Sequence, residues 1–333
     1  MYNYPKNLFT DVRIERIERV GYVIFNDEVT NNSVVSEEGA RIRVYDGKMW
    51  YTSVTNNLDL IQNEIDNLAV LATPNPDIYS DPMVMNFGSE KADVRRYTGD
   101  DDIRKVSRSD FEGMVADYIA KCKDPSIEEI KAYSTGYESC HREKEYYSSK
   151  GAEIKQDVQS CFFAFSYQIT CNGFTTAAVK VYSENNFELI KNHYDEVNAE
   201  RDRYLDFARN GVDVEPGDYV CVLAPVVTAM FTHESFGHKS EADFMLNDKA
   251  LRDEWVLGKK VGSDFVSICD RGDLVNNGYT PFDDEGNKAT ETWLIKNGVL
   301  TGRLHDSKSA AALNEKITGN AARTESNIHL LYE

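Results

Sequence analysis

The chain lacks any apolar run long enough to cross a membrane, and its first residues (MYNYPK) do not form a basic start followed by an apolar stretch. We therefore expect neither a membrane span nor a secretory leader. Basic residues are also in deficit, because 37 Lys and Arg face 56 Asp and Glu, which gives a formal net charge of −19. Binding nucleic-acid phosphates needs a basic surface, so this balance argues against a nucleic-acid partner.

Paired cysteines are missing as well. The six cysteines show neither C-x-x-C spacing nor dense clustering, so we expect free thiols and a cytoplasmic location. No internal repeat or low-complexity segment is present, and 333 residues leave room for about two domains. Residues 210–218 (NGVDVEPGD) are polar and contain the turn formers Gly and Pro. We place the domain boundary there and predict domains 1–214 and 215–333.

Apolar periodicity and turn signals predict alternating strands and helices. Asp46-Gly47 is a hairpin signal between two strands over residues 41–55, and Asn172-Gly173 joins two strands over 152–182. Three helices are expected in this half. The first carries Leu58, Ile61, Ile65 and Leu68, the second opens with a capping box at Ser109 and Glu112, and the third runs from Phe187 to Gly211. Further along, a hairpin at Asn297-Gly298 and a short helix over residues 307–315 are expected.

Histidine is scarce, with six in the whole chain, yet two lie close together in residues 232–238 (THESFGH). Neutral imidazole is a favoured ligand of Zn²⁺, so His233 and His238 are candidate metal ligands. Glu234 lies beside the first of them and is a candidate general base toward a water on the metal. Two histidines do not complete a metal site, so the motif predicts half of one.

The spacing of the two histidines is unusual for a helix. Residues at i and i+5 lie about 140° apart around a regular α-helix, so the imidazoles of His233 and His238 would point away from each other. They can converge only if the helix loosens in a π-type turn, a distortion that concentrates at functional sites. Gly237 is a suitable place for it because glycine has no side chain to crowd the turn.

The surroundings of the motif favour a buried, supported helix. Residues 220–226 (VCVLAPV) read as a buried strand, and Val227, Met230 and Phe231 continue at helical spacing. We therefore expect the motif on a helix that packs against a sheet. Downstream, Glu241 and Asp243 are candidate acceptors that orient the imidazoles.

Residues 233–244 (HESFGHKSEADF) resemble the H-E-x-x-x-H helix of the TldD/PmbA family of zinc peptidases, in its metal-binding, TldD-like branch. Weaker matches follow the order of that family and extend the resemblance over nearly the whole chain. They lie at residues 38–44 (EGARIRV), 147–151 (YSSKG), 283–286 (DDEG), 294–302 (LIKNGVLTG) and 318–323 (TGNAAR) with Ser326.

The resemblance implies a zinc peptidase in which His233 and His238 bind Zn²⁺ and Glu234 is the general base. It also implies peptide or unfolded-protein substrates and a homodimer or a heterodimer with a related subunit. The third ligand in this family is a distal Cys, which would lie beyond Glu333, so the second domain is expected to be incomplete at its carboxy end. Cys269 is the in-chain candidate, although its apolar setting is typical of a buried strand.

The expected fold class is α+β, with an amino-terminal mixed sheet and flanking helices, then a strand-rich domain that carries the metal-site helix. Two alternatives stay open. The chain could be a non-catalytic subunit, or a truncated and inactive family member that binds peptides or a partner. The carboxylates of residues 283–286 could also bind a cation on their own. The sequence identifies neither the peptide substrate nor the dimer partner.

Overall fold

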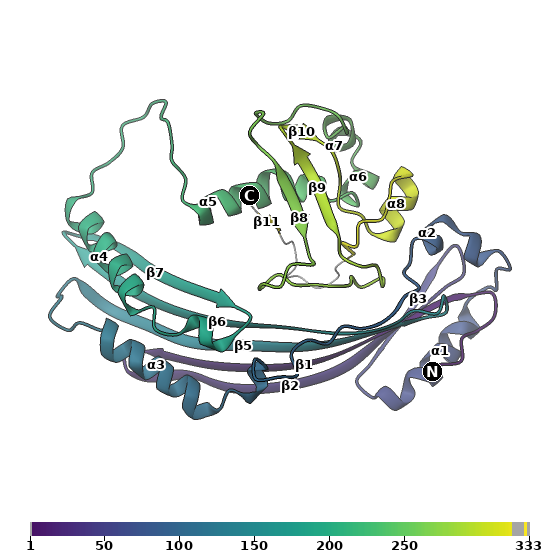
Figure 1. The fold of residues 1–333 in the computed structure, drawn as a ribbon, viewed down its shortest axis with the longest axis horizontal. Helices are drawn as coiled ribbons and strands as arrows, with labels where there is room; N and C mark the ends of the chain where they lie inside the picture. Colours follow the sequence, from purple (N-terminus) through teal and green to yellow (C-terminus); the bar gives the residue numbers. More distant parts are fainter. Residues whose placement is uncertain (1, 322–329, 332–333) are drawn as a thin grey trace.

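The computed structural model describes residues 2–321, 330 and 331 and consists of two lobes (Figure 1). The larger lobe is built on a curved seven-stranded sheet in the order β3-β2-β1-β5-β6-β4, with β7 paired to β6. Its strands are β1 (Phe9–Phe25), β2 (Glu28–Tyr45), β3 (Trp50–Thr55), β4 (Lys91–Asp93), β5 (Ile130–Ser148), β6 (Glu153–Cys171) and β7 (Phe174–Glu184). All neighbours are antiparallel except β4 and β6, so the sheet is mixed, as expected.

The long strands follow from alternation between a buried and a more exposed face. In β6, for example, Cys161, Phe163 and Phe165 are buried while Phe162 is exposed. The predicted turns join these strands, because Gly47 and Gly173 take positive φ values of 94° and 82°, which glycine adopts without strain. The sequence prediction of hairpins at these two turns is confirmed, whereas the full lengths of β1 and β5 were not predicted.

One face of the large sheet is covered by three helices, α1 (Ile61–Leu71), α3 (Arg108–Cys122) and α4 (Tyr194–Asn210). Helix α1 packs Ile61, Ile65 and Leu68 against β1 and β2, as its periodicity predicted. Helices α3 and α4 bury their apolar faces in a second cluster with β5 and β6. In Figure 1 the smaller lobe lies on the opposite, concave side of the sheet.

Two helix boundaries differ from the sequence prediction. The capping box of α3 is formed by Ser107 and Asp110, two residues earlier than expected, since each side chain accepts the other residue's backbone N–H. The helix expected from Phe187 is interrupted: Phe187–Ile190 forms the separate turn η4, and α4 begins at Tyr194. Asn192 between them has a φ of 65°, which breaks the helical path.

The smaller lobe holds a four-stranded sheet in the order β10-β9-β8-β11. Its strands are β8 (Ile268–Arg271), β9 (Glu291–Lys296), β10 (Val299–Leu300) and β11 (Leu330–Leu331), and its helices are α5 (Pro225–Thr232), α6 (Phe244–Asn247), α7 (Lys249–Glu254) and α8 (Ser307–Leu313). The expected hairpin at Asn297-Gly298 and the expected helix from Ser307 are both present. The smaller lobe has its own apolar core, which includes Trp255, Leu294 and Ile295. These observations confirm the α+β fold class.

Short elements complete the described chain. They are η1 (Leu58–Leu60), η2 (Ile78–Ser80), α2 (Pro82–Met85), η3 (Ile103–Lys105), η5 (His233–Gly237) and η6 (His238–Ser240).

Among residues 2–321, 330 and 331, no helix combines the length and the apolar character that a membrane span requires. Of the family-like stretch at residues 318–326, Arg323 and Ser326 lie outside the described residues.

An acidic turn at residues 283–286 joins the two lobes. Asp284 pairs with Arg13 of β1 at 2.9 Å and with Lys144 of β5 at 3.3 Å. The backbone of Phe282 exchanges hydrogen bonds with the Gln156 side chain of β6. The Gly286 backbone lies so close to Gly88 that a side chain at Gly88 would collide with it. The smaller lobe is therefore fixed on the concave face through polar contacts.

The predicted strand over residues 220–226 is wrong. Residues 211–224 contain no helix or strand, and α5 starts at Pro225. Val220 and Val222 are 100% and 97% exposed, and Val226 is 71% exposed. An apolar run becomes buried only where another element covers it. In the described part of the chain, no element covers residues 220–226.

Candidate metal centre

The two histidines of the motif lie on a helix that changes its winding. Helix α5 continues into a π turn at His233–Gly237 and then into a single 3₁₀ turn at His238–Ser240. The backbone N–H of His238 donates to the carbonyl of His233, five residues earlier. This is the loosened turn that the i,i+5 spacing required, and that prediction is confirmed.

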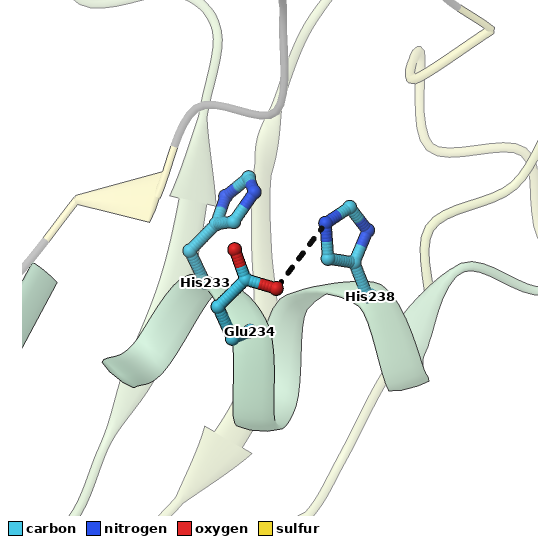
Figure 2. Close-up of side chains that lie close together, drawn as sticks. All are labelled: His233, Glu234 and His238. Atoms are coloured by element: carbon cyan, nitrogen blue, oxygen red, sulfur yellow. Dashed lines mark ion pairs between the residues drawn. The ribbon is translucent and has the colours of Figure 1, made fainter. Parts of the chain in front are cut away.

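The π turn places both imidazoles on the same side of the helix (Figure 2). Their ring centroids are 4.5 Å apart and their planes meet at 76°. One ligand atom from each of His233, Glu234 and His238 lies within 4.8 Å of the others. Ligands of one Zn²⁺ ion lie about 2 Å from it, so small side-chain adjustments would let this set share an ion.

Glu241 orients the second imidazole. Its carboxylate lies 2.7 Å from Nδ1 of His238, and its backbone N–H donates to the carbonyl of that histidine. A carboxylate at Nδ1 favours the tautomer with the proton on Nδ1, which leaves the Nε2 lone pair open to a metal. Burial raises the pKa of Glu241, while the contact with His238 opposes that rise. The side chain of Asp243 is exposed and makes no hydrogen bond within the described residues, so only Glu241 meets the expectation.

Glu234 is the most accessible member of the cluster. Its side chain is 64% exposed, against 41% for His238, and its Oε2 lies 4.0 Å from Nε2 of His238. At this distance the carboxylate makes an ion pair with the imidazole when His238 is charged, but no hydrogen bond, and it remains open to solvent (Figure 2). The position suits a group that exchanges protons with a water molecule at the centre.

Cys269 does not join this cluster. Its thiol is buried at the start of β8, donates to the carbonyl of Asp270, and has a pKa that burial raises to about 11. A thiol binds zinc as the thiolate, and a raised pKa disfavours that form. Cys269 is therefore a poorer ligand than the sequence alone allowed, although its place in a strand is as expected.

The carboxylates of residues 283–286 serve the protein rather than a cation. Asp284 pairs with Arg13 and Lys144, and Glu285 accepts the backbone N–H of Ser307. Asp283 accepts backbone N–H groups from Glu285, Asn287 and Ala321. Since each acid already has protein donors, the structure does not support the alternative of a separate cation site in this turn.

One residue beside the motif was not singled out by its sequence. Ser240 ends the 3₁₀ turn and is fully buried, and its hydroxyl donates to the carbonyl of Phe236 at 2.8 Å. The same hydroxyl accepts the indole N–H of Trp255 at 3.2 Å. Because a buried serine is recognised by its contacts and not by its neighbours in sequence, no local pattern pointed to it.

Comparison with known families gives two matches. Residues 216–331 match the PmbA/TldA metallopeptidase C-terminal domain, and residues 10–72 match the PmbA/TldA metallopeptidase domain 1. The two regions include all but the first residue of β1, the whole of β2, and the whole of the candidate metal centre.

Individual relatives are similar over most of their length. The chain is 28% identical to a zinc metalloprotease TldD homologue of Saccharolobus solfataricus, with 97% of this chain and 70% of the relative covered. It is 27% identical to a metalloprotease of Methanocaldococcus jannaschii, with 94% and 69% covered. The crystal structure of TldE from Thermococcus kodakarensis has a TM-score of 0.69 at 14% identity, covering 98% of this chain and 73% of that one. At that identity the structural likeness speaks for the fold alone.

Proposed function

The chain belongs to the TldD/PmbA family of metallopeptidases, and from this premise we propose that it is a zinc-dependent peptidase acting on peptides or unfolded proteins. The observation that carries the proposal is the convergence of His233, Glu234 and His238 through the π turn. A regular helix would separate the imidazoles by about 140°. The π turn instead brings the two ring centroids to 4.5 Å, as ligands that share one ion require.

The donor set fits Zn²⁺. Two imidazole nitrogens and a carboxylate are ligand types of zinc hydrolases, and Glu241 holds His238 in the tautomer that exposes Nε2. We propose that His233 and His238 hold the ion. The third ligand then comes from outside this cluster, in line with the distal Cys that the family resemblance implies.

The residues divide the proposed chemistry between them. A bound zinc ion supplies a Lewis acid for the peptide carbonyl and makes water easier to deprotonate. Glu234 takes the proton of the attacking water and delivers it to the leaving amine, which suits an exposed carboxylate beside both histidines. Glu241 keeps His238 oriented throughout.

The partners that we propose follow from the family. The substrate is an extended peptide, and the large sheet and the smaller sheet both offer edge strands for backbone pairing. The active form is a homodimer or a heterodimer with a related subunit, and its location is the cytoplasm. A second candidate function is a non-catalytic, peptide-binding or dimerising member. The exposed apolar residues of α5, among them Val226, Met230 and Phe231, favour a covering partner.

Glu234→Gln tests the proposed base. We expect zinc stoichiometry to be retained and the rate of peptide cleavage to fall about 100-fold or more, because general base catalysis contributes on that order. Glu200→Gln is the matched control, since Glu200 lies on α4, away from the candidate centre, and pairs with Arg203 of the same helix. Equal cleavage by Glu234→Gln and the wild-type protein would rule out this base. Absence of zinc from the wild-type protein would favour the non-catalytic function instead.

A further inference from the structure

We propose that Ser240 and Trp255 are positioning residues that hold the π turn and thereby keep the two imidazoles together. The role of these residues in metal binding rests on the proposed function. Their role in holding the turn rests on two hydrogen bonds in the structure. The geometry joins one buried hydroxyl to the turn on one side and to the core of the smaller lobe on the other.

The first contact acts on the turn itself. The hydroxyl of Ser240 donates to the carbonyl of Phe236, four residues earlier and inside the π turn. Serine hydroxyls that bond back in this way compete with the regular helical ladder and bend helices. Here the bond occupies a carbonyl of the turn where the winding changes from π to 3₁₀.

The second contact ties the hydroxyl to the core. Trp255 is 4% exposed, belongs to the apolar core of the smaller lobe, and donates its indole N–H to Ser240 at 3.2 Å. The backbone of Trp255 is itself held by two hydrogen bonds. The Arg303 side chain donates to the carbonyl of Trp255 at 2.7 Å, and the backbone N–H of Trp255 donates to the carbonyl of Leu251. The indole therefore anchors Ser240, at the end of the helix that carries His233 and His238, to the core of the smaller lobe.

The backbone of the same segment is clamped as well. The N–H of Leu304 donates to the carbonyl of Ser240 at 2.8 Å, and the N–H of Ala242 donates back to Leu304 at 3.0 Å. Glu241, which orients His238, lies between these two bonds. The side-chain and backbone contacts together fix where the helix ends, and this fixed end favours loose winding of the six residues from His233 to His238.

The consequence for the site is geometric. If the turn returned to regular winding, the two imidazoles would rotate to about 140° apart and could no longer share an ion. If Ser240 served only as a hydrogen-bond acceptor for the indole of Trp255, its removal would leave the winding of the turn unchanged. The two roles therefore differ in what happens at His238 when the hydroxyl is removed.

Ser240→Ala separates these roles, with Ser235→Ala as the matched control. Ser235 lies in the same π turn, and its side chain makes no hydrogen bond within the described part of the chain. We would measure amide hydrogen exchange in the metal-free full chain, and zinc affinity by calorimetric titration. In Ser240→Ala we expect exchange of the His238 amide to speed up at least 10-fold and zinc affinity to fall at least 10-fold. The amides of Leu294 and Ile295 in β9 should keep their protection, and Ser235→Ala should match the wild-type protein.

Unchanged exchange at His238 in Ser240→Ala would overturn the inference, as would a loss of protection that is equal in β9. Trp255→Phe is a second variant that removes the indole donor and keeps an aromatic ring in the core. It should reproduce the faster His238 exchange even if Ser240→Ala fails to fold, and normal exchange in it would also overturn the inference. If the wild-type protein binds no zinc, the proposed function fails, while hydrogen exchange still decides the role of Ser240 and Trp255.

Discussion

Glu241 illustrates how a single side chain determines what a histidine can do. A histidine has two ring nitrogens, and the one that carries the proton cannot bind a metal. By contacting Nδ1 of His238 at 2.7 Å, Glu241 directs the proton there and leaves Nε2 open. The neighbouring acid Asp243 has the same charge but no such contact, so proximity in sequence does not decide which carboxylate orients the ring.

This difference predicts the effect of removing each acid. Glu241→Ala should weaken zinc binding by about 10- to 100-fold, because the lost contact frees the ring to rotate and change tautomer. Asp243→Ala removes an equal charge two residues away and should leave the affinity within about 2-fold. Zinc titration of both variants at one ionic strength makes the comparison. Equal losses in both would point to a general charge effect instead of orientation.

At the scale of the element, α3 shows why helix starts are hard to read from a sequence. Both Ser107 and Ser109 precede acidic residues at plausible capping distances, at Asp110 and Glu112. The structure chooses Ser107, whose hydroxyl accepts the N–H of Asp110, while Ser109 already lies inside the helix. The apolar face that α3 buries fixes its phase and length, and the cap follows from that.

The choice of cap gives a prediction about α3. Ser107→Ala should lower the free energy of unfolding by about 1 kcal/mol, because the N–H of Asp110 loses the side-chain acceptor of the capping box and keeps only the carbonyl of residue 107. Ser109→Ala makes the same chemical change inside the first turn and should cost clearly less, since alanine favours a helix interior. Urea unfolding followed by circular dichroism compares the two. A larger loss in Ser109→Ala would place the cap where the sequence pattern had put it.

The helix that carries His233 and His238 differs from α3, because its distortion could be predicted from the sequence. Two histidines at i and i+5 converge only in a loosened turn, and the π turn at His233–Gly237 has that form. The contacts that hold it could not be predicted. They come from Trp255 and Leu304, which lie 15 and 64 residues beyond Ser240.

At the scale of the whole molecule, the two lobes meet through buried charge. Asp283 and Glu285 are buried next to each other in the turn that docks on the large sheet. Burial, and then the charge of Glu285, raise the pKa of Asp283 from its ordinary 3.8 to about 7. Burial also raises the pKa of Asp270 in β8 to about 6. The folded protein therefore holds protons on these acids at pH values where the unfolded chain has released them.

These pKa shifts predict that stability depends on pH. A group whose pKa is raised in the folded state stabilises it fully below the unfolded pKa, and this contribution is lost as pH rises through the folded pKa. For Asp283 the loss falls between about pH 4 and 7 and amounts to at most about 1.4 kcal/mol per pH unit. Asp283→Asn cannot titrate, so its free energy of unfolding should fall less steeply over this range.

The measurement is urea unfolding of both proteins at several pH values from 4.5 to 8. The wild-type protein minus Asp283→Asn isolates the one carboxyl, because the contribution of Asp270 is common to both. Parallel curves would mean that Asp283 is ionised throughout this range. The variant should also be less stable at every pH below 7, since its amide nitrogen is only a donor and cannot accept the N–H of Ala321 as an oxygen of the Asp283 carboxyl group does.

Local signals in the sequence determined much of this protein. The hairpins at Asp46-Gly47, Asn172-Gly173 and Asn297-Gly298 follow from backbone preferences of the turn residues themselves. The helix of Ile61, Ile65 and Leu68 follows from the period of its apolar residues. The candidate ligands and their loosened turn follow from spacing along one helix. In each case the interacting residues are near neighbours in the chain.

Only the tertiary structure decided the rest, because the deciding contacts join residues that are distant in sequence. Residues 220–226 are apolar like a buried strand, yet no described element covers them. The acids of residues 283–286 resemble a cation site, yet Arg13 and Lys144 from the other lobe neutralise Asp284. In the sequence Ser240 resembles any surface serine, yet in the structure it is buried and accepts a hydrogen bond from Trp255. Burial and pairing depend on which surfaces meet, and a linear pattern does not contain that information.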